Sequence, residues 1–301
     1  MNPLSGDLWH ETHSMGKFML NKLQPQNIAL HAFLVVVAVL MIGPFYWMVA
    51  TSLKPQSEIL RIPPTLFPSS ITLENYLRVF RVVGAEGSPL IGSAFLNSTQ
   101  ISVFATIGTL FTCSLSAYAF AKIRFRLKQL YFFAFLALLM IPAQVTLIPL
   151  YIVFARIGWV DTLLPLIVPV VLLNPFGIFL MRQYILGIPD AYVESAKIDG
   201  ATHFRIYWSI ILPLCKPALI TLGLLTFIGR WNDFFGPLIY LSTDSKFPLT
   251  LLINSFRGRW TTEWGIFMAA ATVAVVPILI IYFIAQKPLI EGIATTSGIK
   301  G

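Results

Sequence analysis

Charged residues are scarce in this chain of 301 residues. Asp, Glu, Lys and Arg make up 11% of it, whereas hydrophobic residues make up 56% and the mean hydropathy is +0.77. A soluble globular domain carries roughly 25% charged residues. The shortage leaves too few charges to solvate a surface of this size. It excludes an ordinary soluble domain and indicates that lipid is the solvent for much of the protein.

Cysteine is nearly as scarce, since Cys113 and Cys215 are the only two. Both fall inside apolar runs, so they are predicted to be small packing residues and not a disulfide or a metal pair. The phosphate-binding pattern G-x-x-x-x-G-K-[S/T] is absent, so the chain is not expected to hydrolyse ATP or to hold a cofactor itself. The segment His10-Glu11-Thr12-His13 lacks the H-E-x-x-H spacing of a zinc site. No metal ligand and no catalytic residue is predicted.

Long apolar runs are what the sequence has in abundance. A helix needs about 20 apolar residues to cross the hydrocarbon core of a bilayer. Six runs are long enough, near residues 28–50, 94–120, 129–155, 163–184, 209–229 and 265–286. We therefore predict an all-α membrane protein with six transmembrane helices. Proline is frequent inside these runs, which indicates kinked helices suited to a rocking transporter, although proline is also simply common in membrane helices.

Positive charge is concentrated in one short turn. Residues 122–128 carry four basic side chains and no acidic one, namely Lys122, Arg124, Arg126 and Lys128. By the positive-inside rule this turn is cytoplasmic, and counting spans from it places both termini in the cytoplasm. The predicted parts are a cytoplasmic N-terminal tail (1–27), a six-span transmembrane domain (28–286) and a cytoplasmic C-terminal tail (287–301). The connections at 51–93, 156–162 and 230–264 then face outward.

The connection at residues 187–208 has the pattern of helix, glycine break and helix. Asp190 is a good N-cap residue, and Gly200 can adopt the left-handed conformation that ends a helix. Thr202 can cap the helix that follows. The predicted short helix displays Glu194 and Lys197 on the inner membrane surface. From the residues alone, an ordinary amphipathic connector is the preferred explanation of this segment over a docking helix, because interfacial helices are common.

The same segment resembles a known family motif. Its pattern is Glu194-x-Ala196-x-x-Asp199-Gly200-Ala201, followed by Tyr207, Pro213 and Pro217. This is similar to the "EAA" loop of binding-protein-dependent ABC importer permeases, with Ser195 in place of the family's alanine and Tyr207 in place of its phenylalanine. The resemblance continues in Trp231-Asn232-Asp233-Phe234 with Pro237-Leu238. The end of the chain, residues 291–301, resembles that of G-type subunits of maltose permeases.

The resemblance implies a six-span, type I ABC importer permease bundle in the bacterial inner membrane, a multi-pass protein that carries a sugar or oligosaccharide. The implied partners are a homologous second permease, two ATP-binding subunits that hold ATP and Mg²⁺, an extracytoplasmic solute-binding protein and membrane lipid, with no nucleic acid. The implied ATPase-coupling residues are Glu194, Ser195, Ala196, Asp199, Gly200 and Ala201. Glu194 is expected to pair with a basic residue of the ATPase.

Two further sets of residues are candidates for contact with substrate. In maltose-type relatives the outer loop before the last span enters the binding protein, and here that loop contains Arg257, Arg259 and Trp260. An interfacial aromatic belt explains Trp260 equally well. Polar residues within the spans are candidate cavity residues, namely Asn97, Gln100, Gln144 and Asn174. Hydrogen bonding between helices is the commoner reason for such residues.

Two other classes of membrane protein compete with the importer subunit. A self-contained secondary carrier usually has an ionisable residue near the middle of the membrane, whereas the acidic residues here cluster in the loops. A membrane-embedded enzyme needs a catalytic constellation at membrane depth, and the spans contain none. The importer subunit is therefore the preferred prediction, and the secondary carrier is the alternative.

Overall fold

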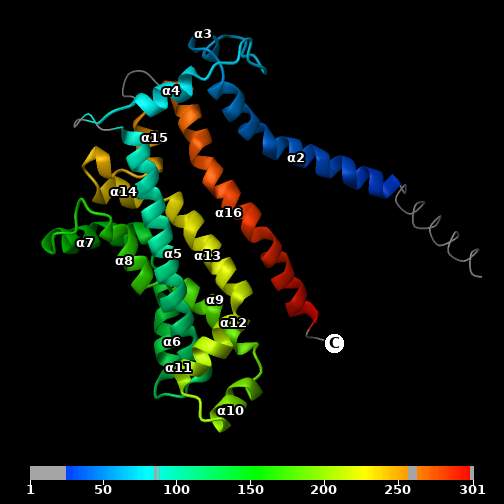
Figure 1. Cartoon of the computed structure of the whole chain (residues 1–301), viewed down its shortest axis with the longest axis vertical. Coiled ribbons are helices and arrows are strands. Elements are labelled where there is room, and N and C mark those ends of the chain that lie inside the picture. The colour runs from blue at the N-terminus through cyan, green and yellow to red at the C-terminus, as the bar shows by residue number, and fades with distance from the viewer. Residues whose placement is uncertain (1–24, 85–86, 88, 257–262, 299–301) are drawn as a thin grey trace, which may run out of the picture.

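The computed structural model describes residues 25–84, 87, 89–256 and 263–298. Over these residues the chain is almost entirely helical, and its one β-bridge joins Val83 to Pro89. Figure 1 shows a tall helical bundle. In chain order the helices are α2 (Pro25–Ser52), α3 (Gln56–Ile59), α4 (Glu74–Arg81), α5 (Leu90–Lys122), α6 (Lys128–Ala137), η2 (Leu138–Met140), α7 (Ala143–Arg156), α8 (Leu164–Leu172), α9 (Pro175–Leu186), α10 (Ala191–Ile198), α11 (His203–Ile206), η3 (Tyr207–Ile211), α12 (Leu212–Leu214), α13 (Lys216–Trp231), α14 (Phe235–Tyr240), η4 (Asp244–Lys246), α15 (Leu249–Ser255) and α16 (Trp264–Gly298). The predicted all-α fold is confirmed.

Four segments in the described part of the chain are long and apolar enough to cross a membrane. They are Ala29–Ser52, Leu90–Lys122, Leu164–Leu186 and Trp264–Gln286. Two more are helix pairs with a sharp bend, Lys128–Met140 with Gln144–Arg156 at 103° and His203–Leu214 with Lys216–Trp231 at 78°. Counting each bent pair as one span gives six, the predicted number.

Three predicted spans are not the continuous helices that their composition indicated, and proline explains each break. Residues preceding proline disfavour the helical conformation, and Ile141 (φ −87°, ψ 114°) and Asn174 (φ −129°, ψ 83°) are both extended before Pro142 and Pro175. Pro217 lies in the first turn of α13, where its missing N–H costs nothing, so a new helix starts there.

The break between α8 and α9 is stabilised by helix α5. In a continuous helix the N–H of residue 175 would bind the carbonyl of Val171, but Pro175 has no N–H. The Thr112 hydroxyl donates to the Val171 carbonyl instead, at 2.6 Å, and the Thr109 hydroxyl donates to Val170 at 3.2 Å. Neighbouring helices satisfy freed carbonyls in this way inside membranes.

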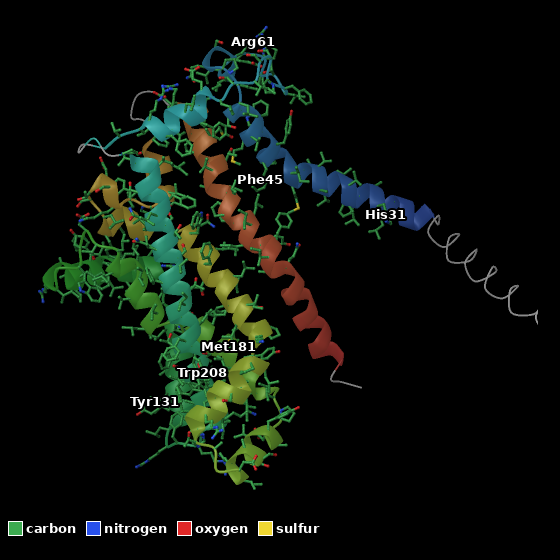
Figure 2. All side chains as sticks on the ribbon, in the orientation of Figure 1. His31, Phe45, Arg61, Tyr131, Met181 and Trp208 are labelled. Atoms are coloured by element: carbon green, nitrogen blue, oxygen red, sulfur yellow. The ribbon has the colours of Figure 1, made fainter. Side chains whose placement is uncertain are left out.

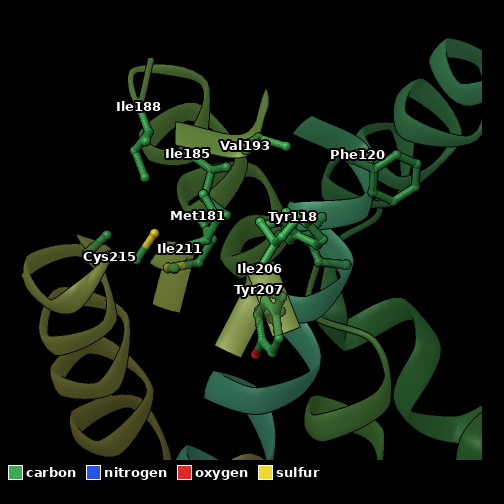
Figure 3. Close-up of a cluster of buried hydrophobic side chains, with 14 of the residues drawn as sticks. Tyr118, Phe120, Met181, Ile185, Ile188, Val193, Ile206, Tyr207, Ile211 and Cys215 are labelled. Carbon is green, nitrogen blue, oxygen red and sulfur yellow. The ribbon is translucent and has the colours of Figure 1, made fainter. Parts of the chain in front are cut away.

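Helix α5 is the centre of the bundle and contacts α8, α9, α13 and α15. Gly177 of α9 lies so close to α5 that a β-carbon there would stand 2.8 Å from Cys113 Sγ. Cys113 and Cys215 are free, buried thiols in one hydrophobic cluster, which agrees with their predicted packing role. Figure 3 shows this cluster, which we call the lower cluster, around Met181, Tyr118 and Tyr207.

Helix α2 leaves the bundle, as Figure 1 shows, although it contacts α16. Its outer surface is apolar and exposed: 71% of Leu40 and 70% of Met41 are accessible. Figure 2 shows its side chains, Phe45 among them, standing clear of the other helices. An exposed apolar surface of this extent needs lipid or another protein to cover it. At the other end of the chain, α16 runs past Gln286 to Gly298, so helix extends into the predicted C-terminal tail.

Candidate functional site

The loop that resembles the family motif has the predicted order of helix, glycine break and helix. Helix α10 ends in a left-handed residue, Gly200 (φ +78°). The N–H of Gly200 donates to Lys197 O and the N–H of Ala201 donates to Ala196 O, which is the Schellman arrangement of a helix end. Thr202 caps α11 by accepting a hydrogen bond from the Arg205 N–H at 3.4 Å. The predicted glycine break and the second cap are confirmed.

The predicted cap at the start of α10 is wrong. Asp190 stands at the N-cap position, but its side chain caps no backbone N–H and its backbone is helical. The carboxylate instead accepts a hydrogen bond from Lys122 Nζ at 2.5 Å. An ammonium group is a stronger partner for a carboxylate than a neutral N–H is. The Lys122 ammonium correspondingly holds the pKa of Asp190 below its usual value.

Helix α10 turns one side inward and leaves the rest exposed. Val193 and Ala196 are buried in the lower cluster, so Ala196 supports the helix from beneath. Glu194, Ser195, Lys197, Asp199 and Gly200 are exposed, and Ala201 is half-buried. The Ser195 hydroxyl donates to Ala191 O at 2.8 Å within the helix. Two exposed residues were missed from the sequence, Tyr192 (52% accessible) and Ile198 (87%).

A hollow lies on each side of α10. One, of about 420 Å³, is lined by both signs of charge, with Lys122, Arg124, Asp190, Glu194 and Lys197 among its residues. The other, of about 350 Å³, is lined by Ala191, Tyr192, Ser195, Ala196, Asp199 and Ile210. The helix therefore forms a ridge between two recesses, a shape that a protein partner can grip.

Helix α5 holds the loop at both ends of α10. Before α10, Lys122 Nζ donates to Ile188 O at 2.6 Å as well as to Asp190. After it, the Tyr118 hydroxyl lies 3.1 Å from His203 Nδ1, and the hydroxyls of Ser114 and Tyr207 lie 2.8 Å apart. Tyr207 belongs to η3, a π-helical stretch that leads into the bent span.

The basic turn after α5 has a structural role that the charge count did not reveal. Lys128 Nζ donates to Ala121 O and Ile123 O at the end of α5, at 3.2 and 3.0 Å. Arg182 Nε donates to Phe120 O at 3.2 Å, and its guanidinium lies 4.1 Å from the centre of the Phe132 ring. Cations are favoured at a helix C-terminus. The turn and the α10 loop lie at the same end of the bundle, because Lys122 bonds to Asp190.

The predicted outward connections meet at the opposite end. Arg78 of α4 pairs with Glu263 before α16 at 2.5 Å. Asp161, in the connection between α7 and α8, accepts hydrogen bonds from Lys246 Nζ, Ser242 N–H, Thr243 N–H and the Thr243 hydroxyl. Asp161 was not predicted to matter, and its left-handed backbone (φ +59°) is not visible in the sequence.

The candidate cavity residues have different surroundings. The Asn97 amide donates to Ser245 O at 2.9 Å and to Phe247 O at 3.2 Å. Asn174 caps α9 by accepting from the Gly177 N–H at 2.8 Å. Gln100 is half-buried on α5 and Gln144 is exposed on α7. The structure does not bring these four together, and their contact with substrate stays a prediction. Arg257, Arg259, Trp260 and the segment His10-Glu11-Thr12-His13 lie outside the described residues.

The structure is therefore a multi-span helical bundle with an exposed, anchored helix at one end. Residues 112–293 match the family described as binding-protein-dependent transport system inner membrane component. The chain is 31% identical over 277 residues to the arabinooligosaccharides transport system permease protein AraQ of Bacillus subtilis, covering 91% of this chain and 96% of that protein. It is also 31% identical to the probable starch degradation products transport system permease protein AmyC of Thermoanaerobacterium thermosulfurigenes, covering 91% and 97%.

The fold is also that of a solved transporter. A chain of a bacterial ABC transporter involved in the import of the acidic polysaccharide alginate superposes with a TM-score of 0.77 at 24% identity, covering 87% of this chain and 95% of that one. The protein belongs to the binding-protein-dependent ABC importer permeases. It is a multi-pass inner membrane transport subunit and not an enzyme, and ATP hydrolysis lies in separate subunits of the importer. The family excludes the alternative of a self-contained secondary carrier.

Proposed function

We propose that this chain forms, with a homologous second permease, the path for a sugar or oligosaccharide delivered by an extracytoplasmic binding protein. The relatives named for arabinooligosaccharides and for starch degradation products support a carbohydrate substrate. Both align along more than nine-tenths of their own length. The exposed apolar surface of α2 is then covered by lipid and by the second permease.

Helix α10 is the proposed docking element for one of two ATPase subunits, which bind ATP and Mg²⁺. The observation that carries this proposal is the exposure of Glu194 on a ridge whose inner side is fixed to the bundle. A carboxylate at a partly desolvated interface forms charge-assisted hydrogen bonds to arginine, which fix orientation as well as affinity. Tyr192 and Ile198 add apolar area to the same contact.

Docking of α10 on a cytoplasmic ATPase also sets the orientation of the chain. The basic turn at 122–128 lies at the α10 end of the bundle, because Lys122 bonds to Asp190. By the positive-inside rule that end is cytoplasmic. Six spans then place both termini in the cytoplasm, and the loop with Arg257, Arg259 and Trp260 faces the binding protein.

Co-purification and uptake test the proposal together. The importer is produced with its ATPase and second permease, and Glu194→Lys is compared with Glu74→Lys, a matched change in the exposed first turn of α4 at the opposite end. We expect Glu194→Lys to lose the ATPase or to hydrolyse ATP without uptake, and Glu74→Lys to retain both. Normal coupled uptake in Glu194→Lys would contradict the docking role.

A further inference from the structure

Helix α5 joins the two functional ends of the molecule without a break. It has 33 residues and contains no proline, whereas three of the other predicted spans are broken. At 1.5 Å per residue it is about 50 Å long. It contacts α8 and α9, on either side of one break, and η3 and α13, on either side of another. Because close-packed protein interiors transmit strain, an unbroken helix packed in this way can carry a displacement along its length.

At its Lys122 end, helix α5 forms hydrogen bonds to the α10 loop both before and after α10. Lys122, whose side chain is 5% accessible, bonds to Ile188 O and Asp190 before α10. Tyr118 and Ser114 bond to His203 and Tyr207 after it. The ring centroids of Tyr118 and Tyr207 lie 5.7 Å apart, and these residues, 2% and 1% accessible, belong to the cluster drawn in Figure 3. Sliding α10 past α5 would leave the buried Lys122 ammonium and the buried Ser114–Tyr207 hydroxyl pair without partners, and unpaired polar groups inside a protein are costly.

At its other end, near Asn97, helix α5 forms hydrogen bonds to a second loop. The Asn97 amide bonds to the carbonyls of Ser245 and Phe247, and the buried Ser98 hydroxyl accepts the Leu249 N–H at 2.8 Å. Lys246, within the same segment, bonds to Asp161 from the other side. The segment 245–249 is therefore held between α5 and the connection at residues 157–163. Lys122 and Asn97 are 25 positions apart, or about 37 Å along the helix.

We propose that α5 is the rod that carries displacement of α10 to the outer segment 245–249, with Lys122 and Asn97 as positioning residues at its two ends. The inference rests on the proposed docking of α10 and adds the route that the motion takes. ATP-driven movement of α10 pulls α5 through Lys122, and α5 moves the outer loops through Asn97. Two sites coupled in this way are linked by contacts that neither site's ligand touches.

The test uses the complete importer in proteoliposomes and measures substrate transported per ATP hydrolysed. Lys122→Met removes the hydrogen bonds from Lys122 to Ile188 O and Asp190. Arg126→Met removes the same charge from an exposed position of the same turn. We expect Lys122→Met to retain the ATPase and to lower the transport ratio about tenfold, within the usual range of coupling between sites. Arg126→Met should match the wild type. Exchanging the charges, Lys122→Asp with Asp190→Lys, should restore part of the ratio.

Asn97→Ala tests the other end of α5. This change lies far from the α10 loop, so we expect the variant to form that loop and to bind the ATPase normally. The transport ratio should fall as in Lys122→Met while the apparent KM for uptake stays unchanged. A change in KM alone would instead indicate that Asn97 contacts the substrate, and would overturn the proposed coupling through α5. A wild-type ratio in Asn97→Ala or in an assembled Lys122→Met would overturn it too. Normal ATPase binding and coupled uptake in Glu194→Lys would refute the docking proposal itself, whatever the outcome at Lys122 and Asn97.

Discussion

Asp161 and Lys246 form an ion pair of 2.7 Å that joins two connections, 85 residues apart in the sequence, at the end of the bundle opposite α10. Lys246 Nζ also donates to the Asp161 carbonyl at 2.7 Å, so both ends of the aspartate are held. Burial alone would raise the pKa of Asp161, but the hydrogen bonds from Lys246, Ser242 and Thr243 outweigh it and hold the pKa well below its usual value. The carboxylate is thus ionised throughout the physiological range.

Replacing Asp161 should loosen the end of the bundle where these two connections meet. Asp161→Ala removes the acceptor of four hydrogen bonds and places alanine at φ +59°. We expect a loss of about 2 kcal/mol, because hydrogen bonds are lost and alanine is strained in the left-handed conformation. Thermal unfolding in detergent measures it. Asp161→Asn keeps a residue that tolerates this backbone and accepts hydrogen bonds, so it should lose less. Equal losses in the two variants would contradict the role assigned to the hydrogen bonds.

The loop after α2 should open at low pH. Hydrogen bonds from the Ser69 and Thr65 hydroxyls and the Ser69 N–H lower the pKa of Glu58 from 4.5 to about 2. A carboxyl with a lowered pKa stabilises the fold above its unfolded pKa, and this stability is lost as the pH falls through the folded value. The protection of backbone amides in residues 54–72 from hydrogen exchange, corrected for the intrinsic pH dependence of exchange, should therefore stay constant from pH 7 to about 5 and fall between about 4.5 and 2.

Glu58→Gln separates this titration from general acid unfolding. Residue 58 of the variant cannot ionise. The protection of residues 54–72 from exchange, corrected for the intrinsic rate, should therefore already be lower than in the wild type at neutral pH and should change less on acidification. An acid response identical to that of the wild type would show that Glu58 is not the group that titrates.

The sequence predicted the composition of the spans better than their geometry. Hydropathy sums are indifferent to backbone direction, so the runs at 129–155, 163–184 and 209–229 were predicted as single helices. The prolines that break them, Pro142, Pro175 and Pro217, were visible in the sequence. Whether a proline bends or breaks a helix depends on what satisfies the freed carbonyls, and here Thr112, on another helix, does so.

The candidate site shows the same division between local and distant causes. Gly200 and Thr202 were predicted correctly because glycine and N-cap signals act within a few residues. Asp190 was misread because Lys122, 68 positions earlier, captures its carboxylate. Charge counting along 122–128 gave Lys122 a role in topology, but its bonds to the α10 loop depend on the tertiary fold.

The Thr112 hydroxyl should stabilise the broken span. Thr112→Val keeps the shape of the side chain and removes the donor to Val171 O, which Pro175 cannot replace. We expect a loss of about 1 kcal/mol, typical of hydrogen bonds between membrane helices. Thr99→Val is the matched control, because its hydroxyl bonds only to Phe95 O within α5. Steric-trapping or thermal unfolding in lipid compares the two, and an equal effect would contradict the interhelical contribution.

The left-handed residue at the end of α10 should be required for docking and not for membrane insertion. Gly200 has φ +78° with open space where a β-carbon would stand, so a substitution acts through the backbone alone. Gly200→Val should cost about 1–2 kcal/mol in a left-handed position, or should shift the loop to avoid that cost. Gly200→Asn, which tolerates this conformation, should cost much less. A change of 1.4 kcal/mol corresponds to tenfold in affinity, so ATPase retained by the Val variant should fall by roughly that factor while membrane levels stay normal. Equal retention in the Val and Asn variants would show that the helix end is not part of the docking surface.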